Sequence, residues 1–155
     1  MSDSHGSRDA VEKIISNNPE ADIFIHLGDG SGEVYTVKIQ YPDLDIRNVR
    51  GNCDFDLESA SYIILEAAGK RIFCTHGHKY GVRSGTGLLR SVARDNGCCA
   101  ALFGHTHERH ISCEDGIDIM NPGSCAMPRD GNKPSYGIID INDAGLFMNI
   151  FDVGI

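Results

Sequence analysis

The hydrophobic positions of this chain follow a helical period in some segments and form short continuous runs in others. The helical pattern predicts helices over residues 7–18 and 86–96, and either a helix or a loop over residues 32–41. In the first of these segments Val11, Ile14 and Ile15 share one face, which is typical of an amphipathic helix. The second ends at Gly97, a residue type that commonly caps a helix at its C-terminus.

Short apolar runs between and after these segments predict β-strands. The predicted strands cover residues 22–27, 45–50, 61–66, 71–75, 98–103, 110–113, 117–120, 136–141 and 146–153. The run at 98–103 contains no charged residue, as expected for a strand that is buried on both faces inside a parallel or mixed sheet. Because helices and strands alternate first and strands dominate later, we expect an α/β fold in one domain covering residues 1–155.

Polar residues with metal-binding atoms follow the ends of successive predicted strands. They are Asp3, His5, Asp29, Asn52, His76, His105 and His107. From His5 onward the successive blocks lie about 23 to 29 residues apart, roughly one strand and one crossover each. Parallel strands bring their carboxyl ends to one edge, so we expect these side chains to converge. Two carboxylates, four imidazoles and one amide are too many for a tetrahedral zinc site, and they suit two divalent ions that share a bridging carboxylate.

Several of these histidines and aspartates also have ordinary structural explanations. His26 is expected to pack on a strand face. Asp29 and Asn52 each follow a glycine and could start turns. The pair His105 and His107, taken alone, fits two surface histidines as well as it fits two metal ligands. These separate explanations do not account for the regular spacing of the whole set.

Composition narrows the classes of function. The formal net charge is −8 and no basic run is longer than Lys70-Arg71, so we expect no nucleic-acid partner. None of the six cysteines forms a C-x-x-C pair, and several fall in apolar runs, which favours free thiols over disulfides. No run approaches 18 apolar residues and no signal peptide precedes Asp3, so we expect a cytoplasmic protein without a membrane partner.

The ordered set of polar residues, together with Gly51-Asn52-Cys53-Asp54 and Asn121-Pro122-Gly123-Ser124, resembles the calcineurin-like metallophosphoesterase superfamily. Within that superfamily the chain is most similar to the compact YfcE-type phosphodiesterases, which are related to the retromer subunit VPS29. The resemblance implies a four-layer α-β-β-α sandwich of two mixed sheets, with the metal ions at the carboxyl edges of the strands.

The same resemblance implies a division of the ligands between two metal ions. The first ion would be held by Asp3, His5, Asp29 and His107. Asp29 would bridge to the second ion, which Asn52, His76 and His105 would complete. The expected ions are divalent, manganese first, with iron, nickel or zinc as alternatives. The implied activity is hydrolysis of small phosphodiesters by a metal-bridging hydroxide, with Asn52 also contacting the ester oxygen.

The group that protonates the leaving alcohol is open at this point. Larger phosphatases of the superfamily carry a histidine where this chain has Cys53, whose thiol is a poor acid catalyst. Asp54, His78 or a metal-bound water are the alternatives, and His78 could instead orient His76. We therefore expect the best substrates to be esters with good leaving groups, such as aryl phosphodiesters.

The Asp-x-His block of the family follows a buried strand, but only Met1 and Ser2 precede Asp3 here. We therefore expect that strand to be absent from this chain, with Asp3 and His5 displaced or disordered and the first metal bound weakly. A neighbouring copy of the chain in a homo-oligomer is one candidate to fill the gap. On this basis the second metal site is expected to be the better formed of the two.

Three functions are compatible with this resemblance. The first is a binuclear-metal phosphodiesterase with a small phosphoester substrate. The second is a non-catalytic protein-binding scaffold like VPS29; the scaffold branch lacks metal-binding histidines, whereas every ligand position is filled here. The third, a nuclease acting on a polymer, is disfavoured by the acidic charge.

Overall fold

The computed structural model describes residues 1–154 of the chain. Its helices are α1 (Arg8–Asn17), α2 (Ser31–Gln40), α3 (Gly87–Asp95) and a 3₁₀ turn, η1 (His78–Tyr80). The two helices predicted from the hydrophobic pattern are confirmed within two residues, and the uncertain segment at 32–41 is the helix α2. Gly97 follows α3 with φ +67°, the left-handed conformation expected of a helix-terminating glycine.

All the predicted strands are confirmed. They are β1 (Phe24–His26), β2 (Ile46–Asn48), β3 (Tyr62–Ala67), β4 (Lys70–Thr75), β5 (Ala100–Leu102), β6 (Arg109–Glu114), β7 (Ile117–Pro122), β8 (Ser135–Asn142) and β9 (Gly145–Asp152). Three of them, β1, β2 and β5, are only three residues long. Strands this short place polar residues of the following turns directly at the sheet edge.

The five-stranded sheet has the order β3-β4-β5-β7-β6 and is mixed. The pairs β4–β5 and β5–β7 are parallel, whereas the hairpins β3–β4 and β6–β7 are antiparallel. The crossover from β4 to β5 contains η1 and α3. Because β4 and β5 are parallel, the residues that follow them, around His76 and His105, leave the sheet at the same edge.

The expected second mixed sheet is not found as one continuous ladder among the described residues. β1 and β2 form a parallel pair, and β8 and β9 form a separate antiparallel pair. The segment 1–4 lies beside β1, where the amino group of Met1 donates to Ile25 O at 2.9 Å. On its other side it accepts a hydrogen bond at 3.0 Å from Cys125 N to Ser2 O. Leu27 N–H also donates to Met1 O at 2.9 Å and Asp3 N–H donates to Gly28 O at 3.0 Å, so the segment follows β1 through successive hydrogen bonds, although it is not assigned as a strand. The mixed-sheet expectation therefore holds for one sheet, and the two-sheet sandwich stays a prediction.

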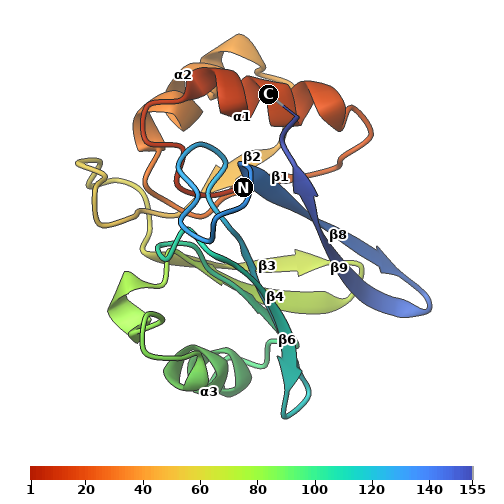
Figure 1. The fold of residues 1–155 in the computed structure, drawn as a ribbon. Coiled ribbons are helices and arrows are strands. Elements are labelled where there is room, and N and C mark those ends of the chain that lie inside the picture. Colours follow the sequence, from red (N-terminus) through yellow and green to blue (C-terminus); the bar gives the residue numbers. More distant parts are fainter. Residues whose placement is uncertain (155) are drawn as a thin grey trace.

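Three hydrophobic clusters stabilise the fold. One packs α1 and α2 against β1 and β2, and one packs α3 against the five-stranded sheet. The third lies between the five-stranded sheet and the strands β1, β8 and β9. Figure 1 shows α1 and α2 at one end of the molecule and α3 at the opposite end, with the strands between them. The α/β class is thus confirmed.

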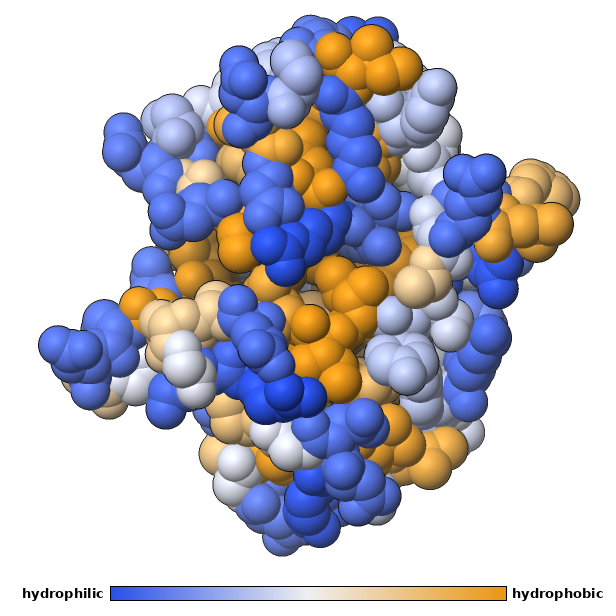
Figure 2. Space-filling view, turned by 180° about the vertical axis from the view of Figure 1, so that it is seen from behind, coloured by the Kyte–Doolittle hydropathy of each residue, from blue (hydrophilic) through white to orange (hydrophobic). Residues whose placement is uncertain are grey.

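A groove of about 690 Å³ lies between β1 and β8, lined by apolar side chains such as Ile25 and Ile139. Figure 2 shows that apolar side chains gather in the middle of the face opposite to that of Figure 1. Within residues 1–154, no helix combines the length and hydrophobicity needed to cross a bilayer.

Candidate metal centre

The backbone is unusual where the predicted ligands lie. Among the described residues, seven residues other than glycine have positive φ, and five of them are predicted ligands. These five are Asp3, His5, Asp29, His105 and His107, with φ between 42° and 70°. The left-handed conformation costs a residue with a side chain about 1 kcal/mol or more, and such outliers cluster at functional sites. The turns after the strands are therefore shaped by the site and not by local preference.

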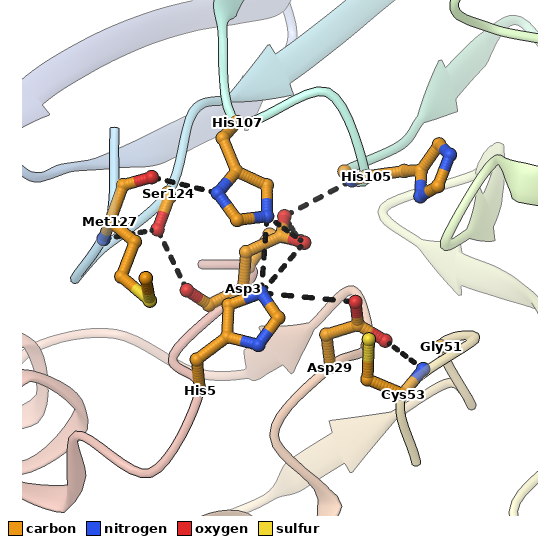
Figure 3. A network of polar contacts seen from close by, with 12 residues as sticks. Asp3, His5, Asp29, Gly51, Cys53, His105, His107, Ser124 and Met127 are labelled. Carbon is orange, nitrogen blue, oxygen red and sulfur yellow. Dashed lines mark hydrogen bonds and ion pairs between the residues drawn. The ribbon is translucent and has the colours of Figure 1, made fainter. Parts of the chain in front are cut away.

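Asp3, His5 and His107 form one compact group. Nε2 of His107 lies 3.2 Å from Asp3 Oδ1 and 3.1 Å from Nε2 of His5. Figure 3 shows the three side chains pointing at one another from segments about one hundred residues apart in sequence. Asp3 is fully buried, yet its Oδ1 has no hydrogen-bond partner in the part of the chain that the structure describes. A buried carboxylate oxygen facing two imidazole nitrogens fits a divalent cation, which is the natural partner for all three atoms.

Asp29, Asn52 and His76 form a second group beside the first. Nε2 of His76 lies 3.4 Å from Asp29 Oδ2 and 3.2 Å from Asn52 Oδ1. The two groups meet at Asp29, whose Oδ2 is also 3.8 Å from Nε2 of His5. Asp29 is therefore the carboxylate that could bridge two ions.

Backbone carbonyls set the tautomers of His76 and His107, the two buried histidines of the site. Nδ1 of His76 lies 2.7 Å from Leu27 O, and Nδ1 of His107 lies 2.7 Å from Met127 O. A carbonyl oxygen only accepts, so each Nδ1 carries the proton and each Nε2 presents a lone pair to the site. This second contact is typical of metal-binding histidines.

His105 stands apart from both groups. Its backbone N–H donates to Asp3 Oδ2 at 3.1 Å, but its ring points away, as Figure 3 shows. Nε2 of the ring accepts a hydrogen bond from Arg83 Nε at 3.0 Å, and the ring centre is 5.1 Å from that of His76.

Two sequence-based expectations about the ligand groups are wrong. Asp3 and His5 are not displaced, and the first ligand group, not the second, is the more completely assembled.

The expected acid role of Asp54 disagrees with its surroundings. Its carboxylate accepts four backbone N–H groups at 2.8–2.9 Å, from Asp29, Gly30, Ser31 and Gly51. Burial opposes the charged form, but these donors outweigh it and lower the pKa of Asp54. Asp54 therefore stays ionised, caps α2 from another segment, and joins the loop after β1 to the loop after β2.

His78 and Cys53 are also poorly placed to donate a proton. The ring centre of His78 is 5.4 Å from that of His76, and Leu27 O occupies the position where His78 would orient that ring. Burial and the neighbouring His76 lower the pKa of His78, so it is neutral near pH 7. Burial and the nearby Asp29 carboxylate raise the pKa of the Cys53 thiol, although its sulfur lies close enough to His5 and Asp29 to join a cation site.

The two carboxylates and two imidazoles that face each other in the site shift one another's pKa values. Burial raises the pKa of Asp3 and Asp29, but the nearby imidazoles of His107 and His76 outweigh burial and lower both. The pKa of His107 is raised by Asp3, and that of His76 is raised by Asp29 against the opposing effect of burial. The carboxylates are therefore ionised at neutral pH, as metal ligands must be.

Sequence reasoning gave no role to residues that support these turns. The buried Asn121 side chain donates to Gly104 O and to Thr106 Oγ1, both at 2.9 Å. Ser124 Oγ donates to Asp3 O at 2.7 Å. Asn121 and Ser124 belong to the motif Asn121-Pro122-Gly123-Ser124, and the family resemblance of that motif was the feature of the sequence that could have indicated their role.

Glycine is required where the loop after β1 meets the loop after β2. Gly28 has φ +96°, and a Cβ there would lie 2.7 Å from Gly51 N and 2.8 Å from His76 Nδ1. A side chain would therefore separate the two loops that carry Asp29 and Asn52.

The calcineurin-like phosphoesterase superfamily domain matches residues 1–144 of the chain. The chain belongs to this superfamily. Its pattern is that of the YfcE-type phosphodiesterases. It is 30% identical over 154 residues to the probable metallophosphoesterase YsnB of Bacillus subtilis, covering 98% of this chain and 88% of YsnB.

The solved structures with a similar fold include the following two. The phosphoesterase YfcE of Escherichia coli superposes with a TM-score of 0.76 at 25% identity, covering 99% of this chain and 91% of that chain. A Vps29 double mutant from Entamoeba histolytica superposes with a TM-score of 0.71 at 19% identity, covering 92% and 88% of the two chains. The likeness to Vps29 concerns the fold alone.

Proposed function

We propose that this protein is a metal-dependent phosphodiesterase that hydrolyses small phosphodiesters at a centre of two divalent ions. The observation that carries the proposal is the junction of two ligand groups at Asp29, with a buried Asp3 Oδ1 that lacks any other partner among the described residues. The family membership and the names of relatives such as YfcE support it. Mn²⁺ is the proposed ion, with Fe²⁺, Ni²⁺ or Zn²⁺ as alternatives for the same mixed oxygen and nitrogen donors.

The first ion would be held by Asp3, His5, Asp29 and His107, and the second by Asp29, Asn52, His76 and His105. When bound, such ions acidify water and withdraw charge from phosphoryl oxygens. The protein contributes two ionised carboxylates and two histidines whose tautomers are set by backbone carbonyls. The Asn52 amide, 3.2 Å from His76, is proposed to contact the ester oxygen as well.

No side chain in the described part of the site is well suited to protonate a leaving group. The oxygens of Asp54 are occupied by four N–H donors, and the lowered pKa of His78 leaves it neutral. The aryl oxide of an aryl phosphodiester can leave without being protonated. We therefore expect aryl phosphodiesters to be hydrolysed much faster than alkyl phosphomonoesters. Comparable turnover of the two classes would contradict this.

The experiment removes metal with a chelator, restores Mn²⁺, and measures hydrolysis of an aryl phosphodiester by wild type, Asn52→Ala and His76→Ala. We expect both variants to lose at least about a hundredfold in kcat/KM, as ligand and electrostatic residues do. His110→Ala is the matched control, because His110 lies on β6 and bonds Ser112 outside the site. Undiminished hydrolysis in both site variants would refute the proposed centre. No hydrolysis by the Mn²⁺-loaded wild type would favour the alternative, a non-catalytic scaffold.

A further inference from the structure

Arg83 is a cation of the site that the ligand set does not include. Its guanidinium Nε donates to His105 Nε2 at 3.0 Å. The side chain of Arg83 is exposed, but its backbone is held in place by its neighbours. Val82 before it is buried in the cluster under α3, and Ser84 N–H after it donates to Gly81 O at 2.9 Å. A charged group held in this way is positioned, unlike a cation on a loose surface loop.

The Arg83 contact is chemically incompatible with metal binding by His105. A ring nitrogen that binds a metal ion has no lone pair left to accept a hydrogen bond. If Nε2 binds the ion, Arg83 loses its acceptor directly. If Nδ1 binds it, the ring proton moves to Nε2, which then donates and cannot accept from Arg83. Metal binding through either nitrogen of His105 therefore breaks its hydrogen bond with the Arg83 guanidinium, which is left free at the edge of the site.

We propose that Arg83 is a phosphate-binding residue, which His105 holds through the hydrogen bond described above and which is released toward the substrate when His105 takes a metal ion. The inference rests on the proposed function and names a further residue of that site. An arginine presents paired N–H donors that match two phosphoryl oxygens. In a protein with a net charge of −8, a freed cation beside the site also offsets repulsion of an anionic ester.

The test compares wild type with Arg83→Gln and Arg83→Lys, and Arg94→Gln is the matched control. Arg94 lies on α3, where it pairs with Asp115. Calorimetric titration measures the affinity of each Mn²⁺-loaded protein for inorganic phosphate, and a separate titration measures Mn²⁺ affinity. We expect Arg83→Gln to weaken phosphate binding about tenfold, the loss of one charge-assisted hydrogen bond, with a similar rise in KM and little change in kcat.

In Arg83→Gln the phosphate affinity should fall whereas the Mn²⁺ affinity should not, a separation that a merely structural role of Arg83 would not produce. Arg83→Gln removes a competitor for His105 and a positive charge, so its Mn²⁺ affinity should equal or exceed that of wild type. Arg83→Lys should recover part of the phosphate affinity, because it keeps the charge but not the paired donors.

A spectroscopic measurement tests the release of Arg83 without any turnover. In ¹⁵N spectra of the metal-free protein, Arg83 Nε–H should be hydrogen-bonded and His105 should carry its proton on Nδ1. Adding Zn²⁺, which is diamagnetic, should abolish the hydrogen-bonded Arg83 signal. An Arg83 signal that persists at metal saturation would overturn the inference.

Failure of this inference is distinguishable from failure of the proposed function. Tight Mn²⁺ binding and diester hydrolysis with equal phosphate affinity in wild type and Arg83→Gln would overturn only the role of Arg83. A wild-type protein that neither binds Mn²⁺ nor hydrolyses any ester would refute the proposed function, and the role of Arg83 with it.

Discussion

Asp54 acts through the backbone of two loops, and its substitution should show this. Asp54→Asn replaces one acceptor oxygen by an N–H₂ group that faces backbone donors at 2.8–2.9 Å. We expect a loss of roughly 3 kcal/mol in the free energy of unfolding at pH 7, because charged hydrogen bonds are broken and a buried donor is left unpaired. Urea unfolding measures it, and Asp43→Asn, an exposed aspartate on the surface before β2, is the control.

The pH dependence of that loss has a definite sign. The pKa of Asp54 is lower in the folded protein than its ordinary value, so its contribution is fully present above the unfolded pKa of about 3.9. The contribution fades as the pH falls through the lower, folded value. The difference between wild type and Asp54→Asn should therefore be constant from pH 5 to 8 and shrink in acid. A difference in unfolding free energy that grows in acid would contradict this. An Asp54→Asn variant of normal stability whose rate no longer falls at high pH would support an acid catalyst instead.

The roles of single residues were harder to predict than their presence. The spacing of Asp29, Asn52 and His76 correctly predicted that they meet, because parallel strands end at one edge. The same spacing could not reveal that the His105 ring turns toward Arg83, since a side-chain rotamer depends on neighbours from another segment. The surroundings of Asp54 could not be predicted for the same reason. Its four partners are backbone groups, which leave no trace in the sequence.

The turns after β5 and β7 support each other, and the link is one side chain. Asn121, at the end of β7, donates to Gly104 O and Thr106 Oγ1 and accepts from Gly123 N, each at 2.9 Å. Asn121→Asp keeps the shape but removes both donations and buries a charge. We expect a loss of roughly 2–4 kcal/mol in stability and weaker Mn²⁺ binding, because the turn carrying His105 and His107 is released.

The control for this substitution lies in the β8–β9 turn. Asn142 Oδ1 only accepts, from Ala144 N at 2.9 Å, and an aspartate keeps that bond. Asn142→Asp should therefore leave both stability and Mn²⁺ affinity close to wild type. Equal effects of the two substitutions would contradict a specific link between the turns, and unchanged metal affinity in Asn121→Asp would restrict its role to stability.

The boundaries of the elements followed from the sequence more closely than the pairing of the strands. Helical stripes and apolar runs predicted α1, α3 and every strand, because their periods are local properties of the chain. The separation of β1–β2 from β8–β9 was not predictable in this way. It depends on the segment 1–4, which hydrogen-bonds along β1 on one side and to Cys125 on the other without being assigned as a strand.

The molecule as a whole should gain stability from its metal ions, because the ligands come from distant parts of the chain. Asp3 and His107 are joined across most of the sequence, and Asp29 links them to His76. An ion that binds only the folded protein adds about 2.7 kcal/mol at a hundred times its Kd. For a chain of 155 residues this corresponds to a rise in Tm of roughly 5–10 °C.

We further propose that residues 1–155 unfold as one domain, since the three hydrophobic clusters share strands of the same sheets. Scanning calorimetry with and without Mn²⁺ should show one transition that moves upward with metal concentration. His107→Ala should lose most of the shift, whereas His110→Ala, on β6 outside the site, should keep it. Two separate transitions would contradict a single domain. A Tm that is independent of Mn²⁺ in wild type would contradict the coupling of metal binding to the fold, because a site assembled from segments about one hundred residues apart cannot bind tightly without stabilising the fold that holds them together.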